Sequence, residues 1–467
     1  MTLRERFRAA ASDWGIGDPA LLDDDAPLTT ADGFDSLTLF KIIVWVEEQT
    51  GQALDPTAVD LTEAWATVGD LLHFVATRAG SPPSSSVCTG SRPQNTVTLG
   101  TRRYRIVDYT PEHASQVATL MTGLWSPDET LNRQYLHWKY SLNPYRDGSR
   151  IFLAMHADEV VGIRGFYGAN WERGGIVEHV LMADDLFVHP DHRNVGLYEH
   201  LMATALGELR TTGAAGVLNL SANPANTVAS LATGWSVGGA FLPLALTRRN
   251  ALAGLRRWLA RQPMLWRLAP RVLSSDERAP FRRLPTNSTR HPLGCSITFE
   301  RVPRIAEMAQ LVARNEVSTR LRHVRDETFF RWRLENPLSD YRYVFADDGG
   351  TLAGFLVLRT LRAPFQPNGE VRVVDYEARD TAVLAALLET ALRQHFPRLT
   401  IWTTSLPPVL RQSLHALGLE APAGDPSVPD WPCALVHRLN EANSDSLFGV
   451  PLDEDAWDMR QIFSMGG

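Results

Sequence analysis

The feature that most limits how this chain of 467 residues can fold is a pattern that occurs in it twice. Each copy has a Trp followed by Asn-Pro, then two apolar stretches of strand character, an Asp, and a Gly before a large apolar residue. The first copy contains Trp138, Asn143-Pro144, Asp185 and Gly234-Trp235, and the second contains Trp332, Asn336-Pro337, Asp375 and Gly418-Leu419. A repeat of this length predicts two structural copies of one unit, in which strands alternate with helices.

The first copy also has a loop suited to an anion. An apolar stretch ends at Val188, Pro190 interrupts it, and an amphipathic helix is predicted from Leu197 to Leu209. Gly196 lies at the start of that helix, where unpaired N–H groups and the helix dipole favour a pyrophosphate. The second copy passes from Asp375 to Ala382 without a Gly, so we expect it to hold no pyrophosphate.

This loop resembles the acyl-CoA signature of the GNAT acyltransferase superfamily, Arg/Gln-x-x-Gly-x-Gly/Ala. Arg193 and Gly196 match the signature, and Tyr198 stands where it has a small residue. The resemblance implies two α/β domains with mixed sheets flanked by helices, a catalytic copy at residues 101–247 and a degenerate copy at residues 295–439. It also implies that an acyl-CoA or acyl-carrier thioester binds at Phe187, Val188, Arg193, Asn194, Val195, Gly196, Leu197 and Tyr198.

The same resemblance assigns the chemistry. In this superfamily the strand before the loop supplies a backbone N–H to the thioester carbonyl, which places that donor near Phe187 and Val188. A carboxylate close to this strand often acts as the base, and Asp184 and Asp185 are the candidates. Because side chains alternate along a strand, we expect only one of the two to face the site. Asp375 at the matching place of the second copy suggests a structural role for Asp185.

The acid of the reaction is less clearly marked. The Tyr that usually protonates the departing thiolate falls at Ser230 in this chain, so the customary acid is missing. We expect Tyr198 or an ordered water to replace it. His179, His189 and His192 are expected in loop and surface roles, and no metal site is predicted.

Residues 1–79 form a strongly acidic segment, with 14 Asp and Glu against 5 Lys and Arg. Asp35-Ser36-Leu37 opens one predicted helix, and another is predicted from Val68 to Thr77. The segment resembles acyl and peptidyl carrier proteins, which are all-α bundles, and the resemblance places a 4'-phosphopantetheine on Ser36. Without it, Asp35 or Ser36 would be interpreted as an ordinary helix cap.

Three segments have no predicted core of their own. Residues 80–100 have the Ser, Pro and Gly content of a flexible linker, with a reach of about 25 Å. Residues 248–294 form an Arg-rich connector, interpreted as a solvated segment or, alternatively, as a docking surface for the acidic domain through Arg256 and Arg257. Residues 440–467 are a tail without an interpretable motif.

Composition excludes several partners. We predict no nucleic-acid partner, because the chain lacks a concentrated basic stripe, and no membrane span, because it lacks a long apolar run. Three distant cysteines and no secretory signal favour a cytoplasmic protein. Lys41 and Lys139 are its two lysines, a scarcity that we attribute to coding bias.

These features predict an acyltransferase in a secondary-metabolite pathway, which passes an acyl group from a carrier or CoA thioester to a small-molecule amine. Two alternatives stay open: a GNAT-type domain that loads, or decarboxylates and loads, its own carrier from acyl-CoA, and a carrier scaffold without catalysis. The expected partners are a phosphopantetheinyl transferase and an upstream acyl-activating, polyketide or nonribosomal peptide enzyme.

Overall fold

The computed structural model describes residues 2–14, 42, 45–46, 49–50, 67–78, 96–193, 195–222, 226–227, 230–231, 233–241, 243–247, 280–282, 284–285, 288–315, 320–362, 370–421, 433–439 and 456–464. Ser36, Asn194, Arg256 and Arg257 lie outside these ranges.

The N-terminal segment contains helices α1 (Leu3–Trp14) and α4 (Val68–Arg78), and α4 confirms the helix predicted there. Its first turn is closed by a reciprocal cap. The Asp70 N–H donates to Thr67 Oγ1 at 3.2 Å, and the Thr67 N–H donates to Asp70 Oδ2 at 3.0 Å. Phe7 on α1 and Leu71 on α4 are fully buried. The complete all-α bundle stays a prediction.

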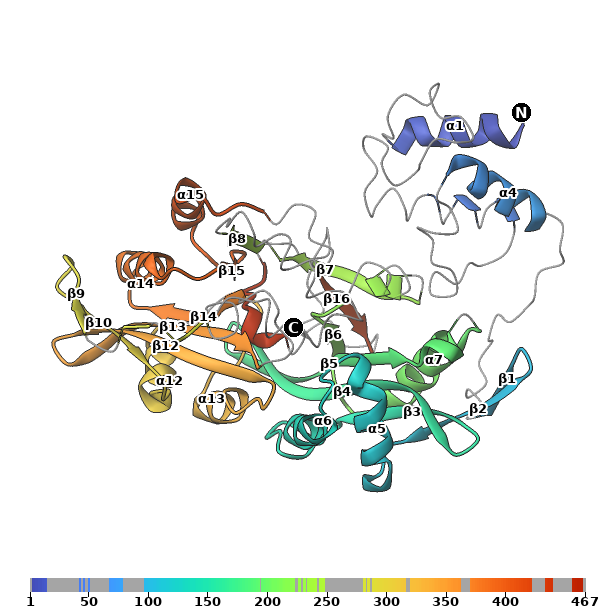
Figure 1. Cartoon of the computed structure of the whole chain (residues 1–467), viewed down its shortest axis with the longest axis horizontal. Coiled ribbons are helices and arrows are strands. Elements are labelled where there is room, and N and C mark those ends of the chain that lie inside the picture. The colour runs from blue at the N-terminus through green and yellow to red at the C-terminus, as the bar shows by residue number, and fades with distance from the viewer. Residues whose placement is uncertain are drawn as a thin grey trace.

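The first sheet is a long mixed sheet (Figure 1). Its neighbours are antiparallel except for β5 and β6, which are parallel. In spatial order its strands are β1 (Thr96–Leu99), β2 (Arg102–Asp108), β3 (Arg150–His156), β4 (Glu159–Arg173), β5 (Ile176–Val188), β6 (Gly216–Asn219), β16 (Cys433–Arg438) and β7 (Ser236–Ala240), with β11 (Arg322–His323) pairing to β4.

The second sheet has the same succession of pairings, with one parallel pair, β14 and β15. In spatial order its strands are β8 (Pro243–Thr247), β15 (Arg398–Trp402), β14 (Glu370–Ala378), β13 (Thr351–Leu361), β12 (Ser339–Asp348), β10 (Ser296–Glu300) and β9 (Thr289–Arg290). The two sheets exchange a strand. β8 follows β7 in the chain but pairs with β15, whereas β16, near the C-terminus, inserts between β6 and β7 (Figure 1).

Helices cover both sheets. In the first, α7 (Leu197–Leu209) buries Leu201 and Met202 against one face, and α5 (Ala114–Leu120) buries Val117 on the other. In the second, α14 (Thr381–Arg393) packs on one face, while α12 (Ile305–Arg314) and α13 (Glu327–Arg333) share a core with residues of both sheets. The remaining helices are α6 (Glu129–Leu136), a π-helical turn (His137–Ser141) and α15 (Pro408–Ala416). Across the described ranges, no helix is both long and apolar enough to cross a membrane.

The repeated Trp and Asn residues explain how the halves fit together. Trp138 and Trp332 stack with ring centroids 5.2 Å apart, and each indole N–H donates to the backbone carbonyl of the other Trp, at 2.9 and 3.1 Å. Asn143 and Asn336 each accept the N–H two residues ahead, which shapes the turn into the next strand. The repeat thus builds a reciprocal junction of the kind found at a two-fold axis.

The last described segment, residues 456–464, completes the junction between the sheets (Figure 1). Trp457 is fully buried against Trp171 of β4, with ring centroids 5.9 Å apart. Arg333 of α13 donates to the Ile462 and Ser464 carbonyls, both at 2.7 Å. This part of the tail, in which the sequence has no recognisable motif, is therefore a structural element of the core.

Candidate active site

The site begins with an irregularity in β5. Ile163 pairs with Phe187 and Gly165 pairs with Asp184, so two residues of β5 lie opposite one residue of β4. This is a β-bulge, and Asp185 takes the left-handed backbone conformation within it, with φ +56°. The bulge breaks the alternation of side chains. Both carboxylates therefore contact one side chain, that of Lys139, and the expectation that only one of them faces the site stays a prediction.

Both carboxylates meet Lys139, which belongs to the π-helical turn after α6. The Lys139 Nζ atom lies 2.8 Å from Asp184 Oδ2 and 2.7 Å from Asp185 Oδ2. Its side chain is fully buried and lies within 5.1 to 5.7 Å of the ring centroids of three tyrosines, Tyr135, Tyr140 and Tyr167. Burial opposes the ammonium charge, but the two carboxylates prevail and hold the pKa of Lys139 well above its ordinary value.

The two carboxylates differ in their surroundings. Asp185 accepts hydrogen bonds from Trp125 Nε1 at 2.8 Å and Tyr140 Oη at 2.5 Å, and is 3% exposed. Burial raises its pKa despite the Lys139 charge. Asp184 accepts a hydrogen bond from the Ser221 hydroxyl at 2.9 Å, and its side chain is 14% exposed. Burial acts to raise the pKa of Asp184, but Lys139 and Ser221 outweigh it, so that pKa is lowered.

Beside the bulge, β5 has no described β6 residue paired along its open edge, the edge that faces away from β4. Of the described residues, Leu181 and Met182 alone join β5 to β6. The His189 N–H donates to the Val161 carbonyl at 2.8 Å. Bonded and non-bonded pairs alternate along an antiparallel ladder, so the Val188 N–H and carbonyl point away from β4, toward the open edge. Arg193 Nε indeed donates to the Val188 carbonyl at 2.9 Å.

The loop after β5 leads into α7, which spans the predicted residues Leu197–Leu209. Gly196 is the N-cap residue with φ 78°, a left-handed conformation that glycine adopts without strain, and it has no side chain with which to cap the helix. The Arg193 guanidinium lies 5.5 Å from the ring centroid of Phe187. Backbone N–H groups at such a helix start form a ready anion site.

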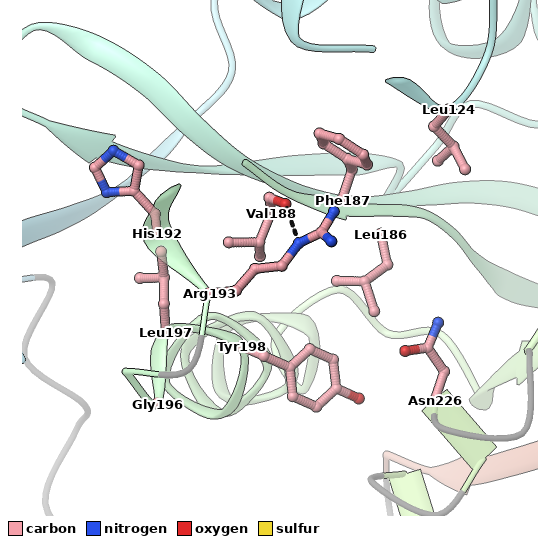
Figure 2. Close-up of a pocket in the computed structure, with 10 residues that line it drawn as sticks. All are labelled: Leu124, Leu186, Phe187, Val188, His192, Arg193, Gly196, Leu197, Tyr198 and Asn226. Carbon is pink, nitrogen blue, oxygen red and sulfur yellow. Dashed lines mark hydrogen bonds between the residues drawn. The ribbon is translucent and has the colours of Figure 1, made fainter. Parts of the chain in front are cut away.

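A cavity of about 350 Å³ lies between these elements (Figure 2). Most of its walls come from the end of β5, the loop and the start of α7, and they combine apolar with polar side chains. They comprise Leu124, Leu186, Phe187, Val188, His192, Arg193, Gly196, Leu197, Tyr198 and Asn226. The structure thus brings together Phe187, Val188, Arg193, Gly196, Leu197 and Tyr198 of the predicted binding set.

Other predicted residues lie elsewhere. Val195 packs at the edge of the core beneath α7. Ser230 is 1% exposed and does not belong to the cavity wall. His192 lines the cavity, where its Nδ1 lies 3.0 Å from the Tyr104 hydroxyl and where burial lowers its pKa, helped by Arg102. His189 forms part of the loop. The described residues contain no cluster of His, Cys, Asp and Glu able to hold a metal ion.

Sequence reasoning missed Lys139, Tyr140, Trp125 and Ser221, which surround the carboxylate pair. One signal was present, because Lys139 is one of two lysines in a chain with 46 basic residues. An ammonium is a compact point charge that fits between two carboxylates, whereas a guanidinium is a broad planar fork. The lysine at this place therefore suits the geometry of the site.

Comparison with known proteins agrees with this geometry. Residues 117–230 match the model of the acetyltransferase (GNAT) family, and residues 6–75 match that of the phosphopantetheine attachment site. The chain thus carries a GNAT acetyltransferase domain and a phosphopantetheine attachment domain. No curated protein matches the chain.

The chain also matches solved structures at low identity. A tandem GNAT protein from the clavulanic acid biosynthesis pathway is 16% identical, over 73% of this chain and 100% of that one, with a TM-score of 0.46. A GCN5-related N-acetyltransferase from Kribbella flavida is 17% identical, over 72% of each chain, with a TM-score of 0.46. A conserved protein from Enterococcus faecalis V583 is 9% identical, with a TM-score of 0.44, and this chain spans 64% of its length.

Proposed function

We propose that this protein transfers an acyl group from a thioester, borne by its own phosphopantetheine domain or by CoA, to the nitrogen of a small-molecule amine. The observation that carries the proposal is the cavity at the open edge of β5, which is lined by the glycine N-cap of α7 and by Leu186, next to the bulge that holds the two carboxylates. The reaction belongs to a secondary-metabolite pathway in the cytoplasm, and the arm is installed by a phosphopantetheinyl transferase and charged by an acyl-activating, polyketide or nonribosomal peptide enzyme.

The donor side of the cavity suits a pantetheine thioester. The apolar side chains of its wall accept the arm, and the start of α7 beside Gly196 accepts a phosphate. The bound arm supplies the thioester, the electrophile of the reaction. Of the two backbone donors predicted for its carbonyl oxygen, the strand register favours Val188, because the Phe187 N–H faces β4 and the Val188 N–H faces the open edge.

We assign the base from the exposure of the two carboxylates, and the acid from its place in the cavity wall. Asp184 is the base, because it is ionised and partly open, whereas Asp185 is enclosed by Trp125, Tyr140 and Lys139 and positions the bulge. Tyr198 lines the cavity and is the acid for the departing thiolate. Ser230, whose side chain is buried, takes no direct part. The second sheet, which repeats the pairings of the first, is a degenerate copy that supports the acceptor side.

The decisive experiment uses the full-length chain after phosphopantetheinylation and follows its intact mass. We expect a preloaded acyl group to leave the arm only when an amine is present, and Ser36→Ala to abolish loading and transfer from the arm. Gain of an acyl group from CoA alone, without loss to amines, would favour the loading reaction. Inertness toward both CoA and amines would favour a carrier scaffold.

A further inference from the structure

Asp184, the carboxylate assigned as base, has one contact with an exposed residue. Ser221 follows β6, is exposed, and its hydroxyl donates to Asp184 Oδ1 at 2.9 Å. The other oxygen of Asp184 contacts Lys139 at 2.8 Å. Asp184 is thus held on one side by a buried cation and on the other by a hydroxyl that reaches solvent.

We propose that Ser221 relays the proton of the acceptor amine to Asp184, and that Lys139 positions the carboxylate pair to receive it. The proposal rests on the proposed function, since it assigns the path of the proton in that reaction. It gives Ser221 a part in proton transfer and Lys139 a positioning role.

The backbone around Ser221 is built to hold the hydroxyl in place. Asn219, at the end of β6, is 3% exposed, and its Oδ1 accepts the Ser221 N–H at 3.0 Å. The same oxygen lies 3.3 Å from Ser221 Oγ. The single hydroxyl proton goes to the nearer, charged acceptor on Asp184, because a bond to a carboxylate is the stronger one. The lone pairs of Oγ are then available to an incoming N–H.

The charges that face Asp184 come from four elements. Within the described residues they are Lys139, Tyr135 and Tyr140 from α6 and the turn after it, Arg164 and Tyr167 from β4, and Asp185 from β5. Lys139 with the two carboxylates carries a net charge of minus one. When a proton binds Asp184, Lys139 keeps Asp185 as its counter-ion, while the buried Arg164 loses one nearby negative charge.

The steps balance. The amine nitrogen forms a bond to the thioester carbonyl carbon, and its proton moves to Ser221 Oγ while the Ser221 proton moves to Asp184 Oδ1. The C–S bond breaks, and the sulfur takes a proton from Tyr198, which water restores. The proton on Asp184 returns through Ser221 to water, so the products are one amide and one thiol.

The test compares Ser221→Ala and Ser221→Thr in the full-length, phosphopantetheinylated protein. Acetyl-CoA is the donor, and ethanolamine, putrescine and glycine are the acceptor probes, across pH 5 to 9. Ser221→Ala should lower kcat about 10- to 100-fold with the KM for acetyl-CoA unchanged. The acidic limb of the rate should move to higher pH, because loss of a hydrogen bond to the carboxylate raises the pKa of Asp184. Ser221→Thr, which keeps the hydroxyl, should restore both.

Ser413→Ala, on the exposed face of α15, is the matched control and should leave the rate unchanged. An unchanged kcat and acidic limb in Ser221→Ala would overturn the relay while leaving acyl transfer intact. Absence of turnover with every amine would instead contradict the proposed function. In that case NMR titration of the carboxyl groups still measures the pKa of Asp184 directly. An equal pKa of Asp184 in Ser221→Ala and in the wild-type protein would overturn the role assigned to Ser221.

Discussion

The helices α7 and α14 follow the bulged strands of the two sheets, and they differ in what completes their first turn. α7 begins at Gly196, which has φ 78° and no side chain to cap the turn. α14 begins at Asp380, whose Oδ1 accepts the Val383 N–H at 2.8 Å. The second sheet therefore carries its own anion where the first has room for one from a ligand. A binding site and a structural cap are alternative uses of the same helix terminus.

The strands before these two helices, β14 and β5, also differ in how far they are paired along the edge next to the site. β14 pairs with β15 over four residues from each strand, whereas β5 and β6 are joined over two in the described ranges. Beyond that pairing, β14 is covered by the tail. Arg460 pairs with Asp375 at 3.4 Å and lies 4.4 Å from the ring centroid of Tyr376. The first sheet keeps a cavity at this place, and the second fills it with its own chain.

The first prediction concerns the buried cations at matching places of the repeat. Lys139→Met should lower the free energy of unfolding by about 3 to 5 kcal/mol at pH 7, because it leaves two buried carboxylates without a partner. Lys139 depresses the folded pKa of Asp184, so its stabilisation is present above the unfolded Asp pKa of about 3.9 and is lost as pH falls through the folded pKa. The deficit should therefore shrink below about pH 4.

Arg333→Met is the matched change. Its hydrogen-bond partners are the Ile462 and Ser464 carbonyls, which do not titrate, so its deficit should change less between pH 7 and pH 4 than that of Lys139→Met. Urea unfolding at both pH values measures both variants. Equal pH dependence in the two variants would contradict the distinct roles.

The second prediction concerns the start of α7, where an Asp can be introduced to match Asp380 at the start of α14. Gly196→Asp should raise the KM for acetyl-CoA on the order of 100-fold, because a carboxylate would compete with the phosphate for the start of α7. Asp tolerates the left-handed backbone better than most residues, so the fold should survive. Steady-state kinetics measures the effect. Asp380→Gly is the control and should leave KM unchanged; an unaffected KM in Gly196→Asp would show that the phosphate binds elsewhere.

The third and smallest prediction tests the symmetry of the junction. Trp138→Phe and Trp332→Phe each remove one indole N–H from a buried carbonyl, at 2.9 and 3.1 Å. Each should cost about 1 to 3 kcal/mol in the free energy of unfolding, and the two costs should agree to within about 0.5 kcal/mol. Thermal and urea unfolding provide the measurement. A large difference between the two variants would mean that one half of the chain depends on the junction more than the other.

Much of the fold follows from local sequence. Short apolar runs predicted β3 and β4, the 3.6-residue period from Leu197 to Leu209 predicted α7, and Gly196 marked its start. The strand exchange between β8 and β16 was not predicted, because strands of similar pattern carry no mark of the sheet they join. The bulge at Asp185 escaped for a related reason: no glycine marks it, and its conformation depends on packing around the carboxylate.

The sequence by itself determined that the chain repeats, that a glycine-containing loop precedes a helix in the first copy, and that an acidic carrier-like segment precedes both. These are properties of neighbouring residues, and short-range sterics, capping and periodicity decide them. Only the tertiary structure decided that Lys139 lies between two carboxylates, that Ser221 reaches Asp184, and that the tail closes the second sheet. Those contacts join residues far apart in the chain, and they depend on a bulge and a strand exchange that arise when the whole molecule packs.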